Sequence, residues 1–134
     1  MREILFRGKR KDNGEWEYGD LWCNPYGKRV VCIVSPVNDQ GTTGGNEVDL
    51  ETVGQYTGLK AKNGRKIFEG DIVKIPLYEG CQERVIAVVA WDILCAVFYL
   101  HGKRVNTDFY HYFGNDCEII GNIHDNPELL EGGE

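Results

Sequence analysis

Two short Asn-Gly turns divide the chain into runs of strand-forming residues, and this pattern limits the folds open to it. The first turn, residues 12–14, follows a short apolar run at residues 4–7 and precedes residues 16–21, where aromatic and polar side chains alternate. The second turn, residues 62–65, is followed by another short apolar run. Glycine after asparagine supplies the positive backbone angles that tight hairpins require. The sequence therefore predicts antiparallel hairpins.

Runs of β-branched and aromatic residues predict further strands. They lie at residues 29–34, 66–68, 72–75, 85–91, 93–100 and 118–123, and residues 128–131 predict one helical turn. The 17 glycines favour short strands and tight turns over long helices. A Gly-Asp pair at residues 70–71 is typical of a corner in a small five-stranded barrel. We therefore expect a mainly β protein whose second half begins near Thr52.

The predicted strand at residues 85–91 is apolar on both faces. Val85, Ala87, Val89 and Trp91 alternate with Ile86, Val88 and Ala90. A strand of an isolated small barrel keeps one face in water, so two apolar faces imply a second cover. Either the N-terminal hairpins or another subunit supplies that cover.

The charges are unevenly distributed along an acidic chain. The formal net charge is −6, yet residues 2–11 carry five basic side chains and one acidic one, and no lysine or arginine follows Arg104. Either the two ends of the chain neutralise each other, or the basic residues form a binding face. A nucleic acid would need such a local basic face, because phosphates repel an acidic protein. The candidate contacts are the basic residues of the two predicted hairpins: Arg7, Lys9, Arg10, Lys62 and Arg65.

Aromatic residues near predicted turns give a second set of candidate contacts, for a protein partner. Aromatic side chains often anchor protein interfaces, although each of them is also compatible with a core position. The candidates are Trp22, Tyr26, Tyr110, Tyr112 and Phe113.

The cysteines indicate a reducing compartment. There are five, an odd number at widely spaced positions, and the chain opens with charged residues rather than a signal peptide. We therefore expect free thiols and a cytoplasmic protein. No C-x-x-C or H-x-x-x-H pair occurs, so no metal site is predicted. The longest apolar stretch, residues 85–100, contains Asp92 and is too short to predict a membrane span.

The sequence contains no recognisable catalytic pattern. His111 lies near Asp108 and Asp116, and a histidine beside a carboxylate is the minimum for general-base catalysis. The same residues are typical of a surface loop, and no G-x-S-x-G nucleophile motif occurs. The glycine-rich residues 41–45 lack the lysine and serine or threonine of a phosphate-binding loop. We therefore predict neither an enzyme nor a bound cofactor.

Five segments, in order from end to end, resemble the YopX family of phage and prophage proteins. They read MREILFRGKR at residues 1–10, GEWEYG at 14–19, TVGQYTGL at 52–59, NGRKIFEGDIV at 63–73 and IGNIHDNPEL at 120–129. The departures are small: Phe68 and His124 stand where this family often has tyrosine.

The resemblance implies an SH3-type small β-barrel over residues 52–134, an N-terminal β-hairpin segment over residues 1–51, and oligomerisation. It implies no activity, because the family has no characterised function and its motifs are rich in residues that fix turns. We therefore expect a non-catalytic protein-interaction or self-associating module in the bacterial cytosol. Its partner would be a second copy or an unidentified host or phage protein. The alternative is a nucleic-acid-binding small-barrel protein that uses the basic hairpins.

Overall fold

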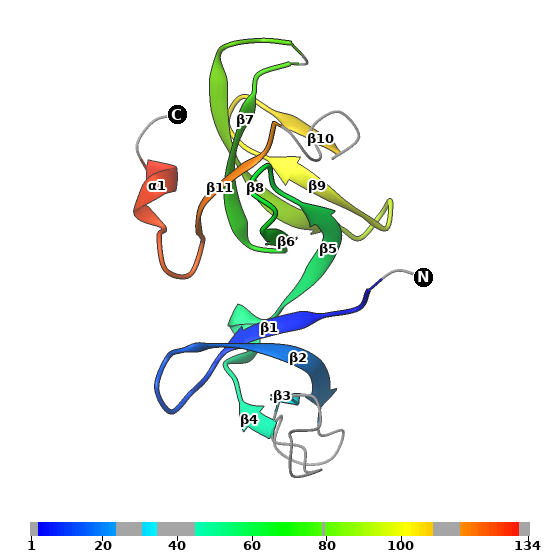
Figure 1. Cartoon of the computed structure of the whole chain (residues 1–134), viewed down its shortest axis with the longest axis vertical. Coiled ribbons are helices and arrows are strands. Elements are labelled where there is room, and N and C mark those ends of the chain that lie inside the picture. Colours follow the sequence, from blue (N-terminus) through cyan, green and yellow to red (C-terminus); the bar gives the residue numbers. More distant parts are fainter. Residues whose placement is uncertain (1–2, 24–30, 35–44, 79, 109–115, 132–134) are drawn as a thin grey trace. The chain divides into compact units, whose positions relative to one another are not determined.

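The computed structural model describes residues 3–23, 31–34, 45–78, 80–108 and 116–131. The chain is mainly β and divides into two compact units, Met1–Tyr56 and Thr57–Glu134 (Figure 1). Along the chain, the boundary between the two units falls within strand β5 (Gly54–Lys60). The sequence predicts two domains, residues 1–51 and 52–134, and this division into domains stays a prediction.

The first unit is an antiparallel sheet built from hairpins. Its strands are β1 (Phe6–Lys9), β2 (Trp16–Cys23), β3 (Val31–Val34) and β4 (Gly45–Glu47), followed by a 3-10 helix at Leu50–Thr52. They lie in the order β4-β3-β2-β1, with the start of β5 beside β1. The predicted turn at residues 12–14 is confirmed: Gly14 has a φ of 72°, and Asn13 Oδ1 accepts a hydrogen bond from Glu15 N at 2.9 Å.

A small apolar core stabilises this sheet. Val31, Ile33 and Val48 are buried, and Phe6, Leu21 and Val53 pack against them. Gly8 permits this packing, because a Cβ at that position would lie 2.9 Å from Val48 Cγ2.

The second unit is built on a five-stranded antiparallel sheet. The five strands are β7 (Asp71–Pro76), β8 (Arg84–Asp92), β9 (Val97–His101), β10 (Asn106–Asp108) and β11 (Glu118–Asn122), followed by helix α1 (Glu128–Glu131). The unit also contains β6 (Lys66–Phe68), which pairs with β5 and not with this sheet. The sheet order is β10-β9-β8-β7-β11, so among the described strands β10 and β11 are unpaired edges. A barrel closes only when its edge strands pair, and the predicted SH3-type barrel is therefore not confirmed.

One face of this sheet forms the core of the second unit. The buried residues are Ala61, Ile67, Val73, Ile75, Val85, Ala87, Val89, Leu100, Val105, Cys117 and Ile119. Three of them come from alternate positions of β8, as the period of a strand requires. The buried carboxylate of Asp71 accepts a hydrogen bond from Phe68 N at 2.8 Å, and this bond fixes the corner at the Gly-Asp pair.

The predicted elements are present with shifted ends, and the first residues of one predicted strand form a turn instead. The predicted strand at residues 93–100 begins only at Val97, because residues 93–96 form a turn. The predicted helical turn at residues 128–131 is confirmed as α1. Within the described ranges, no helix is long and apolar enough to cross a membrane. All five cysteines are described and are free thiols.

Candidate functional site

The turn between β8 and β9 exposes four large apolar side chains close together. Ile93 and Leu94 are 83% and 93% exposed, and Trp91 and Val97 are 45% and 40% exposed. We call residues 91–97 the apolar tip. Exposed apolar residues are ordinary when they are scattered, but a group of them indicates a contact surface.

Hydrogen bonds to Asp92 hold the apolar tip in one backbone conformation. Asp92 Oδ1 accepts from Leu94 N at 2.9 Å and from Cys95 N at 3.3 Å. Asp92 O accepts from Ala96 N at 2.8 Å, and Ala96 has a left-handed φ of 56°. An aspartate that bonds to the backbone two residues later is a common way to make a turn. The apolar tip is therefore an ordered turn, and this explains why the predicted strand starts late.

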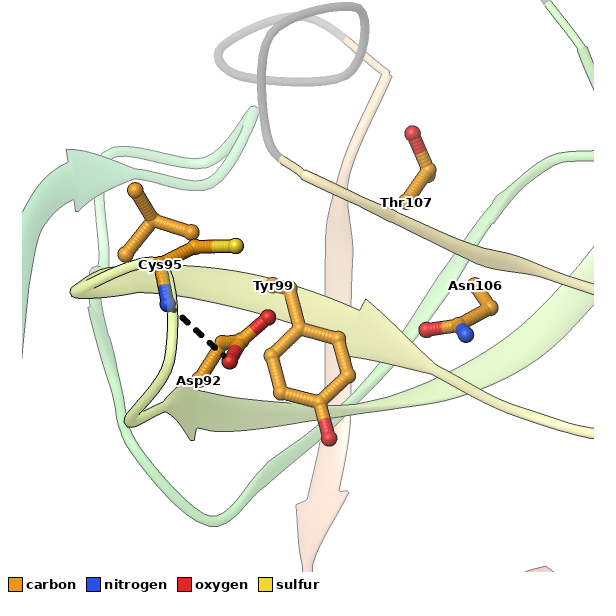
Figure 2. A pocket seen from close by; sticks show the side chains of 6 residues that line it. Asp92, Cys95, Tyr99, Asn106 and Thr107 are labelled. Atoms are coloured by element: carbon orange, nitrogen blue, oxygen red, sulfur yellow. Dashed lines mark hydrogen bonds between the residues drawn. The ribbon is translucent and has the colours of Figure 1, made fainter.

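An open pocket of about 500 Å³ lies beside the apolar tip. Its lining residues come from the end of β8, the turn, β9 and β10, and they are Asp92, Cys95, Val97, Tyr99, Asn106 and Thr107. Figure 2 shows Asp92 and Cys95 joined by their hydrogen bond, with the Tyr99 ring beside them. The lining offers a carboxylate, a thiol, a phenol, an amide and a hydroxyl, so it can donate and accept hydrogen bonds. Such a pocket suits a polar group of a partner.

Cys95 is not an activated nucleophile in this pocket. The negative charge of Asp92 raises the pKa of the Cys95 thiol, and a hydrogen bond between the two side chains adds to the effect. A thiol reacts as the thiolate, so a raised pKa makes Cys95 less reactive. Among the described residues, no group of three His, Cys, Asp or Glu side chains is placed to hold a metal ion.

A smaller pocket of about 230 Å³ lies on the face of the sheet opposite the core. It is lined by Ile86, Val88, His101, Gly102, Lys103 and Leu130, and we call it the outer-face pocket. Leu130 belongs to α1, so this helix contributes part of the cover over β8. Ile86 and Val88 remain half-buried. The two covers predicted from the sequence, the N-terminal hairpins and another subunit, stay predictions.

The helix α1 is held close to the edge strand β11. A Cβ added at Gly121 would lie 2.7 Å from Asn126 Oδ1 and 2.9 Å from Leu129 Cδ1, so a larger residue would displace these side chains. Asn126 Oδ1 also accepts a hydrogen bond from Asn122 N at 3.2 Å. Leu129 therefore packs the helix onto β11, while its neighbour Leu130 lines the outer-face pocket.

The predicted nucleic-acid contacts differ in how far they reach solvent. Arg7 is only 4% exposed, and its guanidinium lies 4.6 Å from the centroid of the Trp16 ring. Lys9 Nζ lies 5.7 Å from the same centroid. Both are cation–π contacts within the first unit. Arg65 belongs to the second unit and is exposed.

Two other predicted nucleic-acid contacts are in ion pairs. Arg10 contacts Asp12 at 2.6 Å and Glu17 at 3.2 Å. Lys62 Nζ lies 3.7 Å from a carboxylate oxygen of Glu118. Acidic partners lower the positive potential that a phosphate would feel, so these pairs weaken a basic binding face.

The predicted protein contacts are only partly described. Trp22 lies on β2 and is 50% exposed, so its side chain is accessible to a partner. Tyr26, Tyr110, Tyr112 and Phe113 lie outside the described residues, as does His111. The apolar tip was not predicted from the sequence, because the apolar residues from Ile93 to Val97 have the pattern of a continuous strand. The signal was the aspartate at position 92, which interrupts the apolar run.

Comparisons with known proteins agree with the fold. The family model described as YopX protein matches residues 5–131. The crystal structure of protein EF1440 from Enterococcus faecalis is similar, with a TM-score of 0.58 and 24% sequence identity, over 97% of this chain and 99% of that chain. This similarity shows a shared fold. No curated protein matches the chain.

Proposed function

Because the chain belongs to the YopX family, we propose that it is a non-enzymatic protein-interaction module of a phage or prophage, acting in the bacterial cytosol. The observation that carries the proposal is the apolar tip. Ile93 and Leu94 are almost fully exposed at the end of an ordered hairpin. In this proposal they are the residues that a partner covers.

Burial of these side chains supplies the driving force for binding. Fully burying one leucine or isoleucine contributes roughly 1.5–3 kcal/mol. The backbone of the tip is already fixed by Asp92, and the rings of Trp91 and Phe98 pack edge to face at its base with centroids 4.8 Å apart. A preorganised contact loses less conformational entropy on binding. The neighbouring polar pocket adds hydrogen-bonding groups at the rim of the contact, where interfaces are usually polar.

The chemistry of the pocket supports binding rather than catalysis. Asp92 raises the pKa of the Cys95 thiol, and its own carboxylate accepts hydrogen bonds from the amides of the turn. These groups hold the tip in shape. The nucleic-acid alternative has less support, because Arg10 and Lys62 are paired with acids and Arg7 is buried.

Light scattering after size-exclusion chromatography tests this proposal. We would compare the wild type with an Ile93→Ser, Leu94→Ser double variant, and use Ile4→Ser as the matched control, because Ile4 is 59% exposed outside the tip. We expect the wild type and the control to exceed the protomer mass of 15.2 kDa, and the tip variant to elute at that mass.

If the wild type is associated, a tip variant that keeps its mass would contradict the proposal. If the wild type itself is a monomer, the same three proteins serve as baits in a bacterial lysate. The proposal then requires a partner that the tip variant loses and Ile4→Ser keeps. The same chromatography at low and high salt with single-stranded DNA tests the nucleic-acid alternative. Co-elution of protein and DNA only at low salt would favour nucleic-acid binding.

A further inference from the structure

We infer that the apolar tip of one copy of this chain binds in the outer-face pocket of a second copy, so that copies associate head to tail. The inference rests on the proposed function, because it names the partner of the same tip. The two surfaces lie in the second unit: the pocket is lined by Ile86 and Val88 in the first half and middle of strand β8, and the tip lies at the end of this strand.

The outer-face pocket has the size and lining that an aliphatic side chain needs. Its volume is about 230 Å³, and Ile86, Val88 and Leu130 give it apolar walls. An apolar cavity of about 150 Å³ already admits a ring as large as benzene. The pocket is therefore large enough for the side chain of Leu94 or Ile93, which are the most exposed large apolar residues described in the chain.

The tip cannot fill the pocket of its own unit. Val88 is the pocket residue of β8 nearest to the turn, and Asp92 begins the turn four residues farther along the same strand. A strand rises about 3.3 Å per residue, so Val88 and Asp92 are about 13 Å apart along the strand. The strand is rigidly paired on both sides, with β7 and with β9. A second copy can bring the two surfaces together.

The charges of the two surfaces are complementary. Asp92 places a carboxylate at the base of the tip, and Lys103 places an exposed ammonium at the rim of the pocket. Among the described residues, no ion pair includes Lys103. When Leu94 enters the pocket, Lys103 of the second copy gains a carboxylate partner. Complementary charges fix the orientation of an interface.

A tip-to-pocket contact joins two different surfaces. In a pair of copies, one copy therefore still has a free pocket and the other a free tip. Such heterologous contacts form rings or open chains, whereas a contact between two identical patches stops at a dimer. The mass of the wild type should therefore rise with concentration beyond twice 15.2 kDa.

Mixing two defective variants tests the inference. One carries Ile93→Ser and Leu94→Ser, and the other carries Leu130→Lys, which places a charge in the pocket. Each alone should be monomeric at concentrations where the wild type associates, with an affinity loss of about tenfold or more. Mixed one to one they retain one intact contact per pair. We expect a species of about twice 15.2 kDa that neither variant forms alone.

Lys103→Glu is a second pocket variant, in case Leu130→Lys does not fold. Lys103 is exposed, so its replacement leaves the core intact. We expect it to weaken association, most strongly at low salt. If the tip variant is monomeric while Leu130→Lys and Lys103→Glu keep the wild-type mass, the inference is overturned and the proposed function stands. A wild type of 15.2 kDa at every concentration also overturns the inference, and the lysate comparison then decides the proposed function.

Discussion

Two of the hairpin turns in the second unit, at residues 62–65 and 92–97, have similar backbone hydrogen bonds but side chains of opposite polarity. In the first, Asn63 Oδ1 accepts from Arg65 N at 3.0 Å. In the second, Asp92 Oδ1 accepts from Leu94 N at 2.9 Å. Each turn also has one residue with a left-handed φ, 85° at Gly64 and 56° at Ala96. The turn at residues 62–65 is polar and exposed, whereas the other presents Ile93 and Leu94.

The difference shows that turn formation does not require the apolar residues of the tip. The aspartate alone supplies the acceptor, and polar residues at positions 93 and 94 would form the same hydrogen bonds. Local sequence choices that disagree with the needs of the fold are typical of functional sites. The proposed binding role of the apolar tip rests on this difference between the two turns.

Two leucines of the same hairpin give the largest expected contrast. Leu100 is fully buried and Leu94 is 93% exposed. We expect Leu100→Ala to lower the free energy of unfolding by about 2–5 kcal/mol, because it leaves a cavity in the core. Leu94→Ala should change it by less than about 0.5 kcal/mol. Denaturant unfolding below the association concentration measures both, and a similar loss in the two variants would show that the tip is part of the core.

The polar turn should matter for stability and not for association. Gly64 has a φ of 85°, and no atom lies within 4 Å of the place where a Cβ would be. Gly64→Ala should therefore lower the free energy of unfolding by about 1 kcal/mol through backbone strain alone. Its mass by light scattering should equal that of the wild type. Loss of association in this variant would remove the distinction between the two turns.

Asp92→Asn separates the charge of the tip from its shape, because asparagine keeps the oxygen that accepts from the turn amides. Without the negative charge the pKa of Cys95 falls, so more thiolate is present at a given pH. We expect iodoacetamide at about pH 8, near the usual thiol pKa, to modify Cys95 a few-fold faster in this variant.

Two other cysteines serve as internal controls for this reaction. Cys23 is exposed in the first unit, and its rate should not change. Cys117 should stay unmodified in the folded protein, because burial raises its pKa to about 12. An unchanged rate at Cys95 would mean that Asp92 does not control this thiol.

The smallest expected effect is at the strained residue of the tip. Ala96 has a φ of 56°, a conformation that glycine adopts without strain. Ala96→Gly should raise the free energy of unfolding by about 0.5 kcal/mol, since relief of strain exceeds the added entropy of the unfolded chain. Thermal unfolding measures the change. A lower melting temperature would show that the turn does not need this conformation.

The hairpins were predictable from the sequence because their signals are local. Asn-Gly pairs and alternating residues place the turns at residues 12–14 and 62–65 and the strand at residues 85–91. The open order of the second sheet was not predictable, because the Gly-Asp pair at residues 70–71 fixes a corner and not the pairing of distant edges.

The two candidate surfaces depend on contacts that sequence patterns do not report. Ile93 has the propensity of a strand residue, and the side chain of Asp92 overrides it with a turn. Leu130 reaches the outer face of β8 only through the packing of α1, and nothing in its local sequence indicates this. Similarly, the burial of Arg7 against Trp16 could not be inferred from a basic run.

Hydrogen exchange of the wild type, measured below and above its association concentration, compares the two turns in a single experiment. If copies bind through the apolar tip, the amides of residues 91–97 should exchange more slowly at the higher concentration. Exchange at residues 62–65 should stay the same. Equal exchange at both concentrations in residues 91–97, in a sample that light scattering shows to be associated, would contradict a binding role for the tip.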